Sequence, residues 1–211
     1  MSNPWEKVPL TDYEAHMKMD DVFQMQILCD LTQKQLFKWH VETVALLGIA
    51  GGNGLVHLEA SGVSKMYGID INREYLKCCR RRFSHLGKKL ELLRLDLSDE
   101  KVQLPKTDLI IANLLIEYIG VKCFVRHIED TNPLYVSCVI QKNSGAPFVS
   151  ASPYSQVFED VSVLHQDINS DSLIREMERI GYVMLFCEDN PLPGGKLLIR
   201  LDFEYISAGG I

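Results

Sequence analysis

The sequence predicts an α/β protein with a doubly wound, seven-stranded and mostly parallel sheet. Two observations support this prediction: short apolar runs alternate with amphipathic stretches through the middle of the chain, and a hairpin pattern closes its last third. Such alternation is typical of a parallel sheet that helices cover on both faces. The runs expected to form the parallel strands are residues 43–47, 65–69, 90–95, 108–112 and 134–140.

The last third of the chain predicts a reversed end of the sheet. Residues 182–187 and 196–205 have strand character, and the Pro/Gly loop Pro191-Leu192-Pro193-Gly194-Gly195 separates them. A loop this short joins strands that run in opposite directions. We therefore expect an otherwise parallel sheet to end in an antiparallel C-terminal strand.

Amphipathic stretches predict the helices. Apolar residues recur at helical spacing over residues 20–40, and Thr11-Asp12-Tyr13-Glu14 fits a capping box for a short helical turn before them. The other stretches expected to be helical are residues 73–86, 114–128, 155–164 and 172–180. The chain thus divides into an N-terminal helical cap (1–40), one sheet domain (41–206) and a C-terminal tail (207–211).

Composition excludes several classes of function. With 46% hydrophobic residues, 211 residues bury one substantial core. The net charge of −6, with no basic tract longer than Arg80-Arg81-Arg82, argues against nucleic acid as a partner. No apolar run reaches the roughly 18 residues of a membrane span, and the N-terminus has no signal-peptide pattern. The six cysteines are scattered without metal-ligand spacing. We expect a cytoplasmic protein with reduced thiols, no metal site and no membrane partner.

A glycine-rich loop is the strongest local signal. The strand ending at Leu47 runs into residues 48–54, which hold four glycines, and a helical stretch is expected over 55–60. Such a unit lets backbone amides and a helix N-terminus approach a nucleotide-type ligand, although an ordinary strand–helix turn can also contain glycine. The dinucleotide fingerprint fails because His57 stands where its third glycine is required, and the Gly-Lys-Ser/Thr of a phosphate-binding loop is absent.

Asp70 follows the next predicted strand, sixteen positions after Gly54. A carboxylate at the carboxyl end of this strand can accept hydrogen bonds from both hydroxyl groups of a ribose. Asp70 can instead cap the helix that starts near Arg73.

These segments form a series. Residues 44–54, then Tyr67-Gly68-Ile69-Asp70, then Leu95-Asp96-Leu97, then residues 107–113 together resemble the motif series of class I S-adenosylmethionine-dependent methyltransferases. The resemblance covers residues 43–205, and the closing hairpin resembles the reversed seventh strand of that family's Rossmann-like fold. The specificity of this resemblance lies in the order of the motifs, because each motif alone is weakly specific.

The resemblance implies a role for each motif. The Gly51-Gly52-Asn53-Gly54 turn would hold the methionine part of S-adenosylmethionine, Asp70 the ribose, and Asp96 with the Leu97 backbone the adenine. Asn113 would face the transferring methyl group; it can also be an ordinary strand-end residue, and Asp96 a helix cap. The implied cofactor-binding set is Gly48, Ala50, Gly51, Gly52, Asn53, Gly54, Asp70, Ile71, Asp96, Leu97 and Asn113.

Two departures from the family pattern qualify these expectations. An acidic residue is usual at the position of Gly48, and glycine at that of Ala50, so another acidic group would have to bind the methionine ammonium. Moreover, Asn113-Leu114-Leu115-Ile116 is not the Asn/Asp-Pro-Pro-aromatic turn of enzymes that methylate planar nitrogens of adenine or glutamine. The resemblance therefore favours a different small-molecule acceptor.

Methyl transfer from a sulfonium requires alignment, exclusion of water and, for some acceptors, a base. We take His16 and Tyr13 as the leading catalytic candidates, together with Asn113, because an aromatic ring next to an imidazole suits both sulfonium packing and proton removal. Further candidates for the base, each with an ordinary structural alternative, are Glu14, Glu117, Tyr118, Tyr154 and His165.

The predicted function is S-adenosylmethionine-dependent methyl transfer to a small molecule. The absence of an acid at Gly48 motivates one alternative, a non-catalytic protein that binds S-adenosylmethionine or S-adenosylhomocysteine as a sensor or partner subunit. The third alternative is an NAD(P)-dependent oxidoreductase, but the glycine spacing does not match the dinucleotide-binding fingerprint. The sequence does not specify the acceptor or the oligomeric state.

Overall fold

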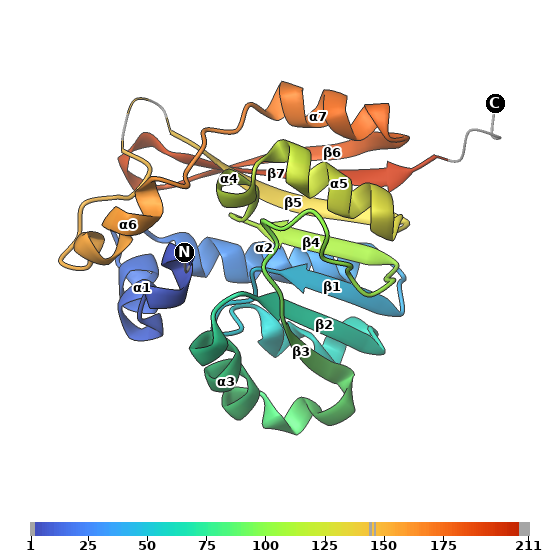
Figure 1. The fold of residues 1–211 in the computed structure, drawn as a ribbon, viewed down its shortest axis with the longest axis horizontal. Coiled ribbons are helices and arrows are strands. Elements are labelled where there is room, and N and C mark those ends of the chain that lie inside the picture. The colour runs from blue at the N-terminus through green and yellow to red at the C-terminus, as the bar shows by residue number, and fades with distance from the viewer. Residues whose placement is uncertain (1–2, 144, 146, 207–211) are drawn as a thin grey trace.

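A computed structural model describes residues 3–143, 145 and 147–206. It contains a seven-stranded sheet in the order β3-β2-β1-β4-β5-β7-β6 (Figure 1). Strands β1 to β5 are parallel, and β7 is antiparallel to both of its neighbours. The strands are β1 (Thr43–Leu47), β2 (Lys65–Asp70), β3 (Leu90–Arg94), β4 (Leu109–Asn113), β5 (Tyr135–Lys142), β6 (Tyr182–Pro191) and β7 (Leu197–Tyr205). The predicted doubly wound sheet with its antiparallel C-terminal strand is confirmed.

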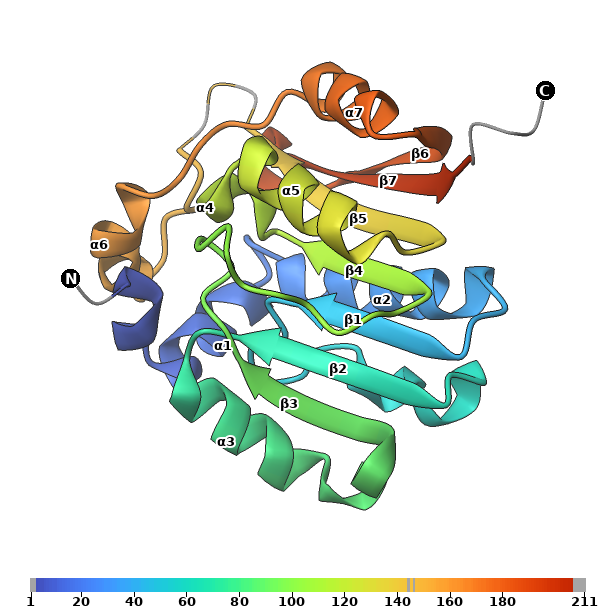
Figure 2. The same cartoon turned by 45° about the vertical axis from the view of Figure 1, so that its right-hand side comes forward.

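Helices cover both faces of this sheet, as Figures 1 and 2 show. The helices α5 (Val121–Thr131) and α7 (Ser170–Arg179) pack on one face, and α2 (Gln24–Lys38) and α3 (Arg73–Arg82) pack on the other. In β1, Ala45 and Leu47 belong to the cluster under α5, whereas Val44 and Leu46 belong to the cluster under α2. Because both faces are covered, the central parallel strands β1 and β4 are almost entirely apolar and buried, as the sequence pattern indicated.

The N-terminal 40 residues have two structural roles. The 3-10 turn η1 (Pro4–Lys7) and α1 (Leu10–Lys18) lie at the carboxyl end of the parallel strands (Figure 2), whereas α2 is part of the layer that covers the sheet. The predicted capping box is wrong: α1 begins after Pro9, and the Glu14 carboxylate pairs with Arg82 of α3. Because Thr11 lies inside the helix, it does not occupy the N-cap position that a capping box requires.

Two stretches that were predicted as single helices are bounded or divided by glycines. The stretch 55–60 forms two 3-10 turns, η2 (Leu55–His57) and η3 (Glu59–Ser61), between left-handed Gly54 (φ 83°) and Gly62 (φ 77°). The expectation that a helix N-terminus follows the glycine loop is therefore wrong. Only the backbone amides of the loop itself are then left to bind a ligand there. The stretch 114–128 is divided at Gly120 (φ 79°) into α4 (Ile116–Ile119) and α5.

A segment between β5 and α7 covers the carboxyl end of the sheet. This covering segment, residues 148–166, contains η5 (Ser155–Phe158) and α6 (Glu159–Ser162) and contacts η1 and α1 (Figure 1). A hydrogen bond of 2.8 Å from the Gln166 amide to the Glu117 carbonyl anchors its end. The remaining 3-10 turns are η4 (Ser84–Lys89) and η6 (Pro193–Gly195).

Within the described part of the chain, every helix is too short or too polar to cross a membrane. The predicted tail, residues 207–211, lies outside the described residues.

Candidate functional site

Three adjoining pockets lie where the carboxyl ends of the parallel strands meet the N-terminal helices. The edge pocket, over β1 to β4, holds about 710 Å³ of empty space including its open mouth. The loop pocket, between the glycine loop and α1 and α2, holds about 500 Å³, and the inner chamber, under the covering segment, about 490 Å³. All three volumes include open space at the mouths of the pockets.

Most of the predicted cofactor-binding residues line these pockets. Seven line the edge pocket: Gly48, Ala50, Asp70, Ile71, Asp96, Leu97 and Asn113. Gly51 and Asn53 line the loop pocket. Gly52 and Gly54 line none of the three, so their predicted direct contact with a ligand lacks support from this geometry.

Asp70 links the glycine loop to the end of β2. Its Oδ2 accepts from the Ala50 amide at 2.8 Å, and its Oδ1 accepts from the Asn72 amide at 2.8 Å. Burial raises the pKa of Asp70 to about 6, against the opposing effect of these amide hydrogen bonds. Each carboxylate oxygen can accept a further hydrogen bond, so this group can both hold the loop and receive hydroxyl donors. The helix cap of α3 is Asn72 and not Asp70.

Asp96 and Leu97, which follow β3, also line the edge pocket. Asp96 Oδ1 accepts from the Ser98 amide at 3.0 Å, which closes a turn that no helix follows. The Leu97 carbonyl accepts from His127 Nε2 at 2.9 Å. In the described part of the chain nothing accepts from the Leu97 amide, which leaves this donor available to a ligand.

The glycine loop owes two of its glycines to packing. A Cβ on Gly52 would lie 2.5 Å from the Phe83 ring, and a Cβ on Gly54 would lie 2.6 Å from Thr32 Cβ. Both positions also have positive φ, as does Ala50 at 48°. Close packing of α2 and α3 therefore requires Gly52 and Gly54, whereas Gly48 and Ala50 present backbone to the pockets.

Asn113 ends β4 with its amide already paired. It accepts from Gln35 Nε2 and donates to Gln35 Oε1, each at 2.9 Å. This reciprocal pair ties the end of β4 to α2, and Asn113 still lines both the edge and loop pockets. The geometry assigns its side chain a positioning role and gives no support to the predicted direct role in methyl transfer.

Solved structures with the same architecture identify the fold. Magnesium protoporphyrin IX methyltransferase from Synechocystis PCC 6803 with bound S-adenosylhomocysteine superposes with a TM-score of 0.68 at 10% identity, over 96% of each chain. Geranyl diphosphate C-methyltransferase from Streptomyces coelicolor A3(2) superposes with a TM-score of 0.65 at 10% identity, over 86% of this chain and 77% of that one. The chain has the class I methyltransferase fold.

A protein with a different activity has a similar fold. The 4+2 cyclase SpnF superposes with a TM-score of 0.63 at 10% identity, over 85% of this chain and 80% of that one. No protein-family model and no curated protein matches the chain. The class I methyltransferase fold is thus established, and the reaction has to be argued from the site.

An acidic group does occur near the methionine end of the motif series. Glu14 is the sole carboxylate among the side chains that line the loop pocket, and its Oε1 lies directly beside Gly51. Arg82 pairs with both Glu14 oxygens, through Nη2 at 2.9 Å, and donates to the Gly51 carbonyl at 3.3 Å. Gly48 has φ 72°, a conformation that favours glycine, which explains why no carboxylate side chain stands there. The spacing of the motifs could not indicate this role of Glu14, because Glu14 lies on helix α1, outside the motif series.

Tyr13 is the one side chain that lines all three pockets. Burial, together with the negative charges of Asp70 and Glu14, raises the pKa of the Tyr13 phenol well above its ordinary value. The phenol therefore stays protonated and is unsuited to the role of general base. Its ring lies 6.0 Å from that of Trp5, in an edge-to-face arrangement that places two aromatic surfaces at the junction of the pockets.

His16 and His165 line the inner chamber from opposite sides. His16 Nδ1 lies 2.8 Å from Ser152 Oγ of the covering segment. Burial lowers the pKa of both imidazoles, and the nearby charge of Lys196 lowers it further, whereas Asp167 opposes the shift of His165. Both histidines are thus neutral near pH 7 and able to accept a proton. Tyr154, also a candidate in the sequence, is exposed and lines none of these pockets.

Glu117 is the deepest ionisable group of the inner chamber, at 2% exposure. Its Oε1 accepts from the Gln141 amide at 2.7 Å, whereas its buried Oε2 has no partner among the described residues. Burial raises the pKa of Glu117 to about 7. The sequence marked Glu117 only as a secondary candidate, because nothing in the spacing reveals that it is buried without a partner for Oε2.

Replacing Glu117 by glutamine should change how stability depends on pH. The folded-state pKa is raised above the ordinary value of 4.5, so ionisation penalises the folded state. The penalty is absent below pH 4.5 and complete above pH 7, and corresponds to about 3 kcal/mol. Denaturant unfolding across this range should show wild type losing stability relative to Glu117→Gln as pH rises. Parallel curves for the two proteins would contradict the assignment.

Proposed function

We propose that the chain is an S-adenosylmethionine-dependent methyltransferase with a small-molecule acceptor. The observation that carries the proposal is the meeting of the three pockets at Tyr13. An adenosyl group, an amino-acid tail and an acceptor need three connected spaces, with the reacting methyl group at their junction. The edge pocket suits the adenosyl group, the loop pocket the tail, and the inner chamber the acceptor.

The residues of the first two pockets fit this cofactor chemically. Asp70 offers carboxylate oxygens to ribose hydroxyls, and Asp96 with the Leu97 amide offers an acceptor and a donor to adenine. Glu14 and Arg82 offer opposite charges to the ammonium and carboxylate of the methionine tail. In this way Glu14 replaces the acid that is missing at Gly48. The alternative of a non-catalytic binding protein rested on that missing acid and loses its main support.

The chain contributes alignment and exclusion of water. When bound, S-adenosylmethionine supplies a methyl group activated by a positively charged sulfur. Tyr13 and Trp5 present aromatic surfaces to that junction, and the covering segment closes the inner chamber over it. His16, His165 and Glu117 are the groups that can receive a proton from the acceptor.

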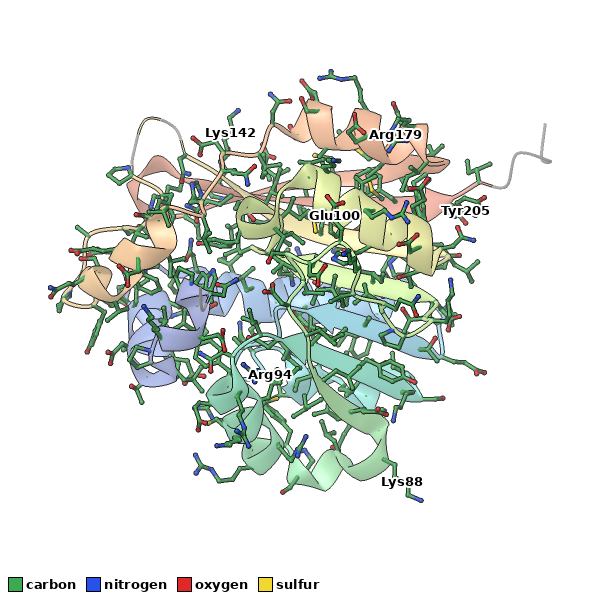
Figure 3. All side chains as sticks on the ribbon, in the orientation of Figure 1. Lys88, Arg94, Glu100, Lys142, Arg179 and Tyr205 are labelled. Atoms are coloured by element: carbon green, nitrogen blue, oxygen red, sulfur yellow. The ribbon has the colours of Figure 1, made fainter. Side chains whose placement is uncertain are left out.

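Similar structures and surface charge agree with a small acceptor. The Streptomyces structure contains geranyl diphosphate and S-adenosylhomocysteine. In Figure 3 the labelled side chains of Lys88, Lys142 and Arg179 project from separate parts of the molecule, and Arg94 lies near η1, where it pairs with Glu6. The net charge of −6 likewise does not favour a nucleic-acid partner.

Equilibrium titration tests the cofactor directly. The purified protein should bind S-adenosylmethionine and S-adenosylhomocysteine in calorimetry and should not bind NAD. Binding of NAD alone would refute the proposal in favour of an oxidoreductase. Formation of S-adenosylhomocysteine from S-adenosylmethionine in the presence of a metabolite pool separates an enzyme from a sensor, and its repeated absence would favour the sensor.

A further inference from the structure

The inner chamber has aromatic walls. The Trp5 ring packs edge-to-face against Tyr118 at 4.9 Å and Phe158 at 6.3 Å between ring centres. On the other side, Phe148 stacks on His165 at 4.0 Å with an angle of 14° between the rings. All five of these side chains line the chamber. Such walls suit a flat ring, and their faces attract a cation.

The same chamber contains a single carboxylate, Glu117, among its lining side chains. Its Oε2 is buried and has no partner in the described part of the chain, whereas buried carboxylate oxygens are ordinarily paired. This oxygen is a hydrogen-bond acceptor that only a ligand can satisfy. A donor that also carries positive charge would satisfy both its hydrogen-bonding capacity and its charge.

The other ionisable groups near the chamber do not neutralise Glu117. His16 and His165 have a lowered pKa and are neutral near pH 7. The amino group of Lys196 donates to the Phe148 carbonyl and to Ser150 Oγ, both at 2.9 Å, so it is committed to the covering segment. The chamber therefore combines aromatic faces with one uncompensated acidic oxygen.

We propose that the acceptor is a small arylalkylamine, an aliphatic amine that carries an aromatic ring, bound as its ammonium ion with an N–H group donating to Glu117 Oε2. This inference rests on the proposed methyltransferase function and names the substrate class of the same site. The ring of the amine lies among Trp5, Tyr118 and Phe148, and its nitrogen faces the junction at Tyr13. Glu117 is then a catalytic residue, because it touches the reacting nitrogen.

Proton transfer to Glu117 prepares the nitrogen for reaction. The ammonium gives one proton to Oε2, which leaves a neutral amine with a free electron pair. That pair forms the new nitrogen–carbon bond while the carbon–sulfur bond breaks and its electrons stay on sulfur. The product is the methylated ammonium ion, and the proton on Glu117 later leaves to water. Neutralising the amine first also avoids bringing two positive charges together.

Three ligands of matched shape test the proposal on the wild-type protein. With S-adenosylhomocysteine at saturation, calorimetry compares 2-phenylethylamine, 2-phenylethanol and 3-phenylpropanoate, which carry a cation, a neutral hydroxyl and an anion on the same ring. We expect the amine to bind at least about tenfold more tightly than the alcohol, and the anion to bind most weakly. Equal binding of amine and alcohol, preference for the anion, or no binding of any of the three would overturn the proposal.

Two variants test which carboxylate causes the preference for the amine. Glu117→Gln should abolish the preference for the amine while leaving the affinity for S-adenosylhomocysteine unchanged, since Gln can still accept from the Gln141 amide. Glu159→Gln removes an exposed carboxylate from the covering segment and should preserve the preference. An amine preference that survives in Glu117→Gln would refute the role of Oε2. If S-adenosylhomocysteine itself fails to bind wild type, the proposed function fails instead, so the two failures are distinguishable.

Discussion

Replacing Asp70 by alanine is expected to weaken binding of S-adenosylhomocysteine by at least about tenfold. The carboxylate is 8% exposed and lines the edge pocket, where hydrogen bonds from hydroxyl groups to a charged acceptor are strong. The change also releases the Ala50 amide, which donates to Asp70 at 2.8 Å and holds the glycine loop. Calorimetry measures the effect with S-adenosylhomocysteine and with 5′-methylthioadenosine, which lacks the amino-acid tail. Both ligands should lose affinity to a similar extent.

Asp99→Ala is the matched control for this change. Asp99 is exposed, lies outside the edge pocket and accepts only from the Lys101 amide in the same turn. Its removal should leave both affinities unchanged.

Because the pKa of Asp70 is about 6, the affinity of the wild-type protein for S-adenosylhomocysteine should also fall as pH drops below this value, where protonation removes the acceptor. An affinity unchanged in Asp70→Ala would show that Asp70 has only a structural role.

Replacing Glu14 by glutamine should separate the two ends of the ligand. Glu14 lines the loop pocket beside Gly51, and its proposed partner is the ammonium of the methionine tail. We expect S-adenosylhomocysteine to bind at least about tenfold more weakly, because a charge-assisted hydrogen bond to the ammonium is lost. Binding of 5′-methylthioadenosine should not change, since this ligand has no ammonium group. The contrast with Asp70→Ala assigns each carboxylate to one end of the cofactor.

Glu74→Gln controls for removing a carboxylate from the vicinity of α3, the helix that also contains Arg82. Glu74 lies on the exposed side of α3 and pairs with Lys77 at 2.7 Å. Its replacement should leave both ligands unaffected. If Glu14→Gln weakened both ligands equally, its role would be to hold Arg82 and the glycine loop in place, and the assignment to the ammonium would be wrong.

The sequence predicted the parallel strands closely because their signal is local. The run 43–47 is apolar on both faces, and β1 occupies the same residues, Thr43–Leu47. Helix α3 begins at Arg73, as expected, since Asn72 caps it through its own side chain. By contrast, the stretch 55–60 contains no helix breaker of its own, yet it forms two 3-10 turns that meet at Leu58 and are bounded by left-handed Gly54 and Gly62. Local periodicity does not record such flanking conformations.

Some residues of the candidate site could be predicted from the sequence and others could not, again because a sequence shows only local patterns. Asp70 and Asp96 follow strands, so their place at the carboxyl edge follows from strand order. The predicted ligand contacts of Gly52 and Gly54 remain predictions, because a glycine required by the packing of α2 and α3 looks the same in sequence as one required by a ligand. Glu14 gained its importance only from α1, which crosses the edge of the sheet from a separate part of the chain.

By itself, the sequence determined the alternating strands and helices, the reversed last strand and the two carboxylates at the ends of β2 and β3. These features depend on side-chain period and on the residues next to each strand. Only the tertiary structure decided which long-range partners meet: Glu14 with Gly51 and Arg82, Asn113 with Gln35, and Glu117 with the aromatic chamber. Burial and the absence of a partner for Glu117 Oε2 arise from contacts between distant segments, which no local pattern encodes.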